Sequence, residues 1–286
     1  MAKSPAKFRS GSNARHESFL RYAGYRWLWI ASAICLLAIA AYALNGVRPR
    51  PSGGSIYGYT VGTISALLIV WLTLLGLRKR AITTGAWSLK SWVSAHVYLG
   101  LSLVVLATLH TGFKFDWNVH TLAYGLMMLV IVSGVIGVVL YLKLPRLLSE
   151  NRGETTQRQM LEAIHAIDRQ LDTAAQPLSE GDAAFVRMSV EQTNIGGGLI
   201  SRLTGQYPGC GTARALKLLG KHTGGDQQAL EQIGELLKRK TEILVTLRRH
   251  IQLRAQLEIW LKVHIPATFA LLAALIVHIF SVFFYW

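Results

Sequence analysis

The chain has 286 residues, of which 51% are hydrophobic and only 16% are charged, and its formal net charge is +15. A soluble protein has a charged fraction of about a quarter, so the composition favours a membrane protein. The basic residues lie mainly beside apolar runs, a distribution that indicates membrane topology rather than nucleic-acid binding. We therefore expect a lipid bilayer as the environment and no nucleic-acid partner.

Five apolar runs are each about long enough to cross a bilayer as a helix. Four lie within residues 27–145 and the fifth covers residues 259–286, so the fold class expected is an all-α integral membrane protein. Residues 1–26 form a polar, basic leader. The run Ala41–Ala43 resembles a signal-peptidase site, but the long leader and the flanking tryptophans favour a retained anchor over a cleaved signal.

A polar segment of 113 residues, 146–258, separates the fourth and fifth spans, and Pro145 is expected to end the helix before it. Residues 155–174 carry apolar side chains at helical spacing and predict a helix. From Gln227 the apolar residues keep near-heptad spacing, which predicts a long amphipathic helix that runs unbroken into the fifth span at Trp260. The region between is expected to form glycine-rich loops and short helices.

The distribution of basic residues predicts the orientation. Of the 30 Lys and Arg residues, 27 fall in segments on one side of the membrane, and only Arg48, Arg50 and Lys114 fall on the other. Basic loops remain in the cytoplasm. We therefore expect a bacterial or archaeal inner (cytoplasmic) membrane protein with a cytoplasmic N-terminus, a helical cytoplasmic insertion and a C-terminus outside.

Two of the five spans carry one histidine near each end. The third span has His96 and His110, and the fifth has His264 and His278, with fourteen residues between the members of each pair. Fourteen residues of helix advance by about 21 Å and return within about 40° of the starting direction. Each helix therefore directs both imidazoles toward one neighbour, one near each membrane face.

The predicted topology places His96 and His264 at the inner depth and His110 and His278 at the outer depth. A histidine in a lipid span is costly and by default functional. Two facing neutral imidazoles form an axial ligand set for haem iron. We predict two non-covalent bis-histidine b haems, with structural hydrogen bonding and metal or proton handling as alternative roles for these histidines.

Other residues are candidates for lesser roles. Gly100, one turn after the first of these histidines, is expected to clear space for a macrocycle, and Lys114 is a candidate partner for an outer-haem propionate. His120 is either a hydrogen-bonding group for a quinone or propionate, or an interfacial histidine without such a role. Gly58 and Gly62 belong to a stripe of small residues that makes room either for a porphyrin edge or for plain helix packing.

The two cysteines exclude some cofactors. Cys35 lies in an apolar run and Cys210 in a predicted soluble loop, so they form no disulfide framework. Iron–sulfur clusters usually need four thiolates, and the sequence has no CxxCH motif for covalent haem attachment. We interpret Cys210 as a turn cysteine rather than a nucleophile, because no paired histidine is evident.

Two histidine-bearing helices separated by one intervening span resemble the dihaem b-type membrane cytochromes, in the broad sense of the cytochrome b and ferric-reductase-like transmembrane superfamily. The resemblance covers about residues 59–142 and 260–286, and its motif positions are His96, His110, His264 and His278, with Gly100 as a small residue beside a haem. It implies haem binding and electron transfer. The insertion departs from the ferric-reductase pattern, and so does the lack of flavin and nicotinamide domains.

The function expected is electron transfer across the inner membrane, as the dihaem cytochrome b subunit of a larger redox complex. The expected partners are other redox subunits, which hold iron–sulfur clusters, flavin or multihaem cytochrome c, or a quinone. Two alternatives remain open. The first is a self-contained quinol dehydrogenase or metal reductase, and the second is a haem-free metal or proton transporter or assembly factor.

Overall fold

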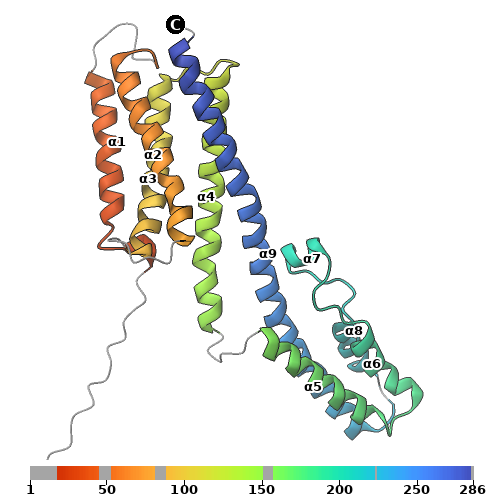
Figure 1. Ribbon diagram of the computed structural model, residues 1–286. Helices are drawn as coiled ribbons and strands as arrows, with labels where there is room; N and C mark the ends of the chain where they lie inside the picture. Colours follow the sequence, from red (N-terminus) through yellow and green to blue (C-terminus); the bar gives the residue numbers. More distant parts are fainter. Residues whose placement is uncertain (1–17, 45–52, 81–87, 151–156, 223, 285–286) are drawn as a thin grey trace, which may run out of the picture. The chain divides into compact units, whose positions relative to one another are not determined.

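The structure, a computed structural model, describes residues 18–44, 53–80, 88–150, 157–222 and 224–284. Within these ranges the regular secondary structure is helical, with no strands (Figure 1). Five of the helices are long and apolar enough to cross a membrane. The chain is therefore an all-α membrane protein, as its composition predicts. Residues 1–17 of the leader, and Arg48 and Arg50, which the sequence predicts on the outer side, lie outside the described residues.

The membrane-spanning helices are α1 (Arg26–Leu44), α2 (Ile56–Arg80), α3 (Leu89–Thr111), α4 (Val119–Glu150) and the second half of α9 (Gln227–Phe284). A short 3-10 helix, η1 (Phe19–Arg21), precedes α1. The histidine-bearing helix α3 is capped at both ends: Ser88 Oγ accepts a hydrogen bond from the Ser91 N–H. At the other end, Gly112 takes the left-handed conformation (φ 59°) that glycine adopts without strain.

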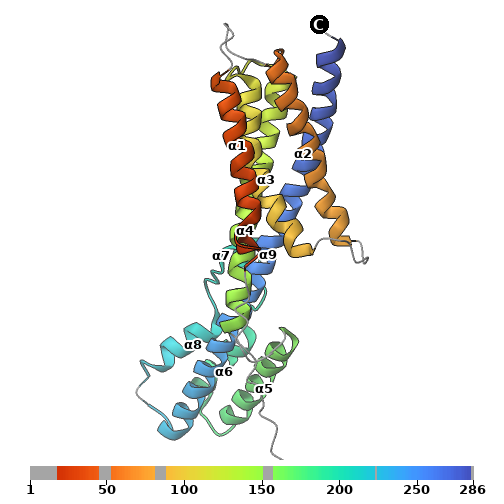
Figure 2. The same ribbon diagram turned by 90° about the vertical axis from the view of Figure 1, so that its left-hand side faces the viewer.

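The chain divides into two compact units, residues 1–135 with 264–286, and residues 136–263. In the first unit α3 packs between α1 and α2, and Figures 1 and 2 show these three helices side by side. One apolar core joins side chains of all five helices: Trp27, Ala31, Ile69, Leu72, Ala95, Leu99, Leu103, Met127 and Leu271. This core fixes the position of α3 along its axis relative to α2, α4 and α9.

The helix α4 continues past Pro145 to Glu150, so the prediction that this proline ends the helix is wrong. A proline removes one backbone hydrogen bond, and α9 likewise contains Pro266 within its length. Leu144, Leu147 and Leu148 continue the apolar periodicity on both sides of the proline, which favours continuation of the helix.

The second unit contains α5 (Gln157–Ala175), α6 (Glu180–Glu191), α7 (Leu199–Thr204), α8 (Gly211–Leu219) and the first half of α9. The predicted helix 155–174 and the unbroken helix from Gln227 into the fifth span are both confirmed. Buried apolar side chains of α5, α6, α8 and α9 form two clusters. The first is Ile167, Leu171, Val186, Ala215, Ile233 and Leu237, and the second is Met160, Ile164, Leu244 and Leu247.

A buried lysine lies in the middle of the second unit. Lys240 on α9 is 1% exposed, and its Nζ lies 2.5 Å from the Asp168 carboxylate on α5. The same ammonium donates to the backbone carbonyl of Ser189 on α6 (2.9 Å) and to its hydroxyl (3.1 Å). Because a buried charge is costly without partners, this group ties three helices together.

Candidate haem-binding site

Three histidines from three helices gather at one end of the first unit. The ring of His278 on α9 lies between that of His110 on α3, at a centroid distance of 6.0 Å, and that of His120 on α4, at 4.6 Å. Both ring pairs are close to perpendicular, with interplanar angles of 72° and 85°. The Nδ1 atoms of His120 and His278 are in direct contact at 2.6 Å.

The two ring separations differ in what they can hold. A metal–nitrogen bond to imidazole is about 2 Å long, so two imidazoles on one iron have centroids about 6 Å apart. The separation of His110 and His278 matches that requirement. His120 and His278 are too close for a metal between them, because their nitrogen atoms already touch. Of these two ring pairs, only His110 with His278 has a centroid separation compatible with one iron between the rings.

The imidazole of His110 is fixed against the backbone of α2. Its Nδ1 lies 2.7 Å from the carbonyl oxygen of Gly58. A Cβ at Gly62 would lie 2.5 Å from His110 Cε1, so only glycine permits this close approach. Of the two interpretations of the small-residue stripe, the structure shows close packing of a histidine ring. Room for a porphyrin edge stays a prediction.

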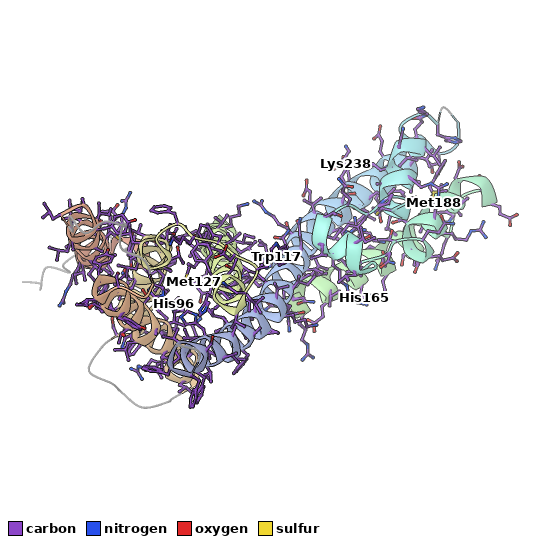
Figure 3. All side chains as sticks on the ribbon, turned by 90° about the horizontal axis from the view of Figure 1, so that it is seen from above. His96, Trp117, Met127, His165, Met188 and Lys238 are labelled. Carbon is purple, nitrogen blue, oxygen red and sulfur yellow. The ribbon has the colours of Figure 1, made fainter. Side chains whose placement is uncertain are left out.

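At the other end of the unit lie His96 on α3 and His264 on α9. The Nδ1 of His96 lies 3.1 Å from the carbonyl oxygen of Leu72 on α2, and the Nδ1 of His264 lies 2.8 Å from Ser133 Oγ on α4. Figure 3 shows His96 and Met127 in the interior of the helix bundle. The two histidines predicted for the inner depth thus lie at the same end of the unit, each with its own hydrogen-bond partner on a neighbouring helix.

The hydrogen bonds also fix the protonation of the rings. Carbonyl oxygens only accept, so His96 and His110 donate from Nδ1. The Ser133 hydroxyl donates its proton to the Val130 carbonyl at 2.8 Å, so its oxygen accepts from His264. A neutral imidazole that donates from Nδ1 carries its lone pair on Nε2, where it can bind a metal. Hydrogen-bond acceptors of this kind, on the ring nitrogen that does not bind the metal, are typical of metal-ligating histidines.

Two further predicted site residues, Gly100 and Lys114, are less closely packed. A Cβ at Gly100 would meet only Leu72 Cδ1, at 3.9 Å, so this position has space beside it. Lys114 is exposed just beyond the end of α3, where its backbone N–H donates to the Thr111 carbonyl. The role of Gly100 beside a haem and that of Lys114 as a propionate partner both stay predictions.

Sequence reasoning missed the groups that orient the rings. Two are backbone carbonyls, of Leu72 and Gly58, which carry no signal in the sequence. Ser133 was interpretable only as a small packing residue, and its spacing from the fifth span gives no indication of a contact with His264. The contact of His120 with His278 was also missed.

Cys210 lies outside this bundle, buried at the N-cap of α8. Its Sγ accepts a hydrogen bond from Arg248 Nη2 at 3.2 Å, and the Arg248 guanidinium stacks on the ring of Tyr207 at 4.1 Å. Burial raises the pKa of this thiol, but hydrogen bonds from the Ala213 N–H and from Arg248 outweigh it and lower the pKa below its ordinary value. The sequence predicts a turn cysteine, and the structure instead places Cys210 directly after a turn, as the N-cap residue of α8.

Within the described residues, no three His, Cys, Asp or Glu side chains form a group that could hold a metal ion by themselves. A bis-histidine haem needs only two protein ligands, because the porphyrin supplies the other four. Comparisons with family models, with curated proteins and with solved structures found no match. What the site can do is therefore inferred from its own residues.

Proposed function

We propose that the chain is a dihaem b-type membrane cytochrome that carries electrons across the inner membrane as a subunit of a larger redox complex. The observation that carries this proposal is the His110–His278 pair, whose ring centroids lie 6.0 Å apart, as two axial ligands of one iron require. His96 and His264 lie fourteen residues before these two histidines on the same two helices, and we propose that they form the second ligand pair.

The protein's own contribution is to hold and orient the imidazoles, three of which have an acceptor for their Nδ1 proton. The carbonyls of Gly58 and Leu72 and the hydroxyl of Ser133 accept the Nδ1 protons, so the metal-binding Nε2 atoms keep their lone pairs. Apolar side chains around the two levels exclude water, which sets the local dielectric. Haem b, when bound, supplies a one-electron redox centre.

The distance between the two levels suits a transmembrane route. Fourteen residues of helix correspond to about 21 Å, and the apolar core of a bilayer is about 30 Å thick. Sites at the two levels would therefore lie near opposite faces of the core. The proposed donor and acceptor are other redox subunits or a quinone, with Lys114 as a propionate partner at the outer level.

One specific observation favours a second candidate function. The 2.6 Å contact between the Nδ1 atoms of His120 and His278 requires a shared proton, and His110 lies beside the same ring. A haem-free protein that passes protons through the membrane would use such a chain of imidazoles. Bis-histidine ligation and proton transfer therefore make opposite predictions about the pigment of the purified chain.

The test is a reduced-minus-oxidised visible spectrum of the purified chain, combined with haem quantitation per polypeptide. The cytochrome proposal predicts two haem b per chain and a low-spin spectrum. A colourless chain that regains no pigment after incubation with haem would contradict it. Proton flux through colourless protein in liposomes would then support the second candidate.

The proposed orientation has a separate test. With 27 of the 30 Lys and Arg residues on one side, a periplasmic reporter fused after Trp286 is expected to be active, and a cytoplasmic reporter at the same position inactive. The opposite pattern would exchange the inner and outer levels without affecting the pairing of the histidines.

A further inference from the structure

The short helix α7 exposes two large apolar side chains in its first turn. Leu199 is 65% exposed and Ile200 is 77% exposed, although the second unit has its own buried cores. The next residues of the helix include Arg202, whose side chain is also exposed. An apolar pair beside a basic residue is the pattern of a segment that lies in a membrane interface.

This helix is held firmly to α9. Gln252 Nε2 and Gln256 Nε2 both donate to the carbonyl oxygen of Leu203, at 3.1 Å and 3.0 Å. Gly205, which follows in the left-handed conformation, lies against Gln252, since a Cβ there would come within 2.7 Å of the amide oxygen. The end of α7 is therefore fixed to α9 at residues 252–256, and Figure 1 shows α7 beside α9.

The packing of α4 against α9 relates positions along α4 to positions along α9. Trp260 of α9 packs directly on Gly137 of α4, where a Cβ would collide with the indole ring. The two helices run in opposite directions, so six residues beyond Gly137 on α4 correspond to six residues before Trp260 on α9. Lys143, the first charged residue after the apolar run of α4, is therefore level with Arg254.

Arg254 is midway between the two glutamines that hold α7. A residue of helix rises by about 1.5 Å, so both glutamines lie within about 3 Å of that level. Each headgroup layer of a bilayer is roughly 6 Å thick. The fifth span begins at residue 259, so Gln256 lies about 4–5 Å outside it, within the thickness of one headgroup layer. The exposed turn at Leu199 begins only about 6 Å along α7 from the attachment at Leu203.

We propose that α7 inserts Leu199 and Ile200 into the lipid headgroup layer and so holds the second unit to the membrane surface. The level of attachment favours lipid over a protein partner. The charge of this region agrees, because Arg202, Arg249 and Arg254 are exposed and anionic lipids attract basic residues at the surface. This inference rests on the membrane-spanning fold and does not depend on haem.

The test uses the full chain in liposomes of phosphatidylethanolamine and phosphatidylglycerol, with both cysteines replaced (Cys35→Ser, Cys210→Ser). Nitroxide spin labels are attached at Leu199→Cys and, in a second variant, at Ile200→Cys. Collision with oxygen, which concentrates in lipid, is compared with collision with a water-soluble nickel chelate. Two labelling sites guard against a local perturbation by either substitution.

Two matched controls calibrate the scale. Val132→Cys labels an exposed apolar position within the span of α4. Val245→Cys labels an exposed apolar position on α9 that lies nine residues before Arg254, about 14 Å farther into water. The ratio of oxygen to nickel collisions is expected to be several-fold higher at 199 and 200 than at 245, approaching the value at 132.

Two results would overturn the proposal. Labels at 199 and 200 that collide with the nickel chelate as often as the label at 245 would place α7 in water. Labels shielded from both reagents would mean that protein, not lipid, covers this turn.

Discussion

The Oγ atom of Ser133 lies 2.8 Å from Nδ1 of His264 and donates its own proton to the carbonyl of Val130. The serine is therefore an acceptor toward the imidazole and holds it in one tautomer and one orientation. Its place on α4, a helix with none of the four proposed ligands, makes it a direct test of whether these histidines ligate a metal.

We predict that Ser133→Ala weakens binding of the proposed inner haem through His264. The hydrogen-bond acceptors of ligating histidines contribute roughly 10–100-fold to metal affinity. The measurement is haem content and midpoint potential of the purified variant. Ser102→Ala is the matched control, because that buried hydroxyl bonds only the Leu99 carbonyl of its own helix. Equal potentials in the two variants and the unmodified chain would mean that Ser133 does not orient a ligand.

Gly62→Ala is predicted to remove one haem per chain. The new methyl group would fall 2.5 Å from Cε1 of His110, so the ring has to leave its place against α2. Gly76→Ala on the same helix is the control, since a Cβ there meets nothing within 4 Å. The measurement is the haem content per chain of both variants. An unchanged haem content in Gly62→Ala would contradict the role assigned to His110.

The Cys210 thiol is predicted to ionise below its ordinary pKa of 9.0, because the hydrogen bonds from Ala213 N–H and Arg248 outweigh burial. The pH dependence of alkylation in a Cys35→Ser background measures this pKa, and Arg248→Met should raise it. Since the folded pKa is lowered, the thiolate's stabilising effect is present above the unfolded pKa. It is lost as pH falls through the folded pKa. An unchanged profile in Arg248→Met would refute the assigned cause.

Lys240→Met is predicted to destabilise the second unit by about 3–5 kcal/mol, because it leaves the Asp168 carboxylate without its buried partner. Hydrogen exchange of the amides of α5 and α9 in the full chain measures the change. The control is Lys238→Met, which removes an exposed pair with Glu235 and should leave exchange unchanged. Adding Asp168→Leu to Lys240→Met should restore much of the protection, and a failure to do so would locate the loss elsewhere.

Much of the fold follows from the sequence, because each long helix carries a strong periodic pattern. The apolar runs predict five spans, and the heptad spacing from Gln227 predicts the unbroken α9. Pro145 was misleading, since a single lost hydrogen bond does not outweigh the apolar periodicity around it. The histidine levels follow from helix geometry alone. What holds the rings could not be predicted, because two of the acceptors are backbone carbonyls whose positions depend on how α2 packs against α3.

The most direct test of the two-site claim is haem content in the four single variants His96→Ala, His110→Ala, His264→Ala and His278→Ala. Each is predicted to retain one haem per chain. His110→Ala and His278→Ala should share one residual midpoint potential, and His96→Ala and His264→Ala should share another. Two haems retained after any of these substitutions would show that the residue is not a required ligand and would contradict the paired-histidine account.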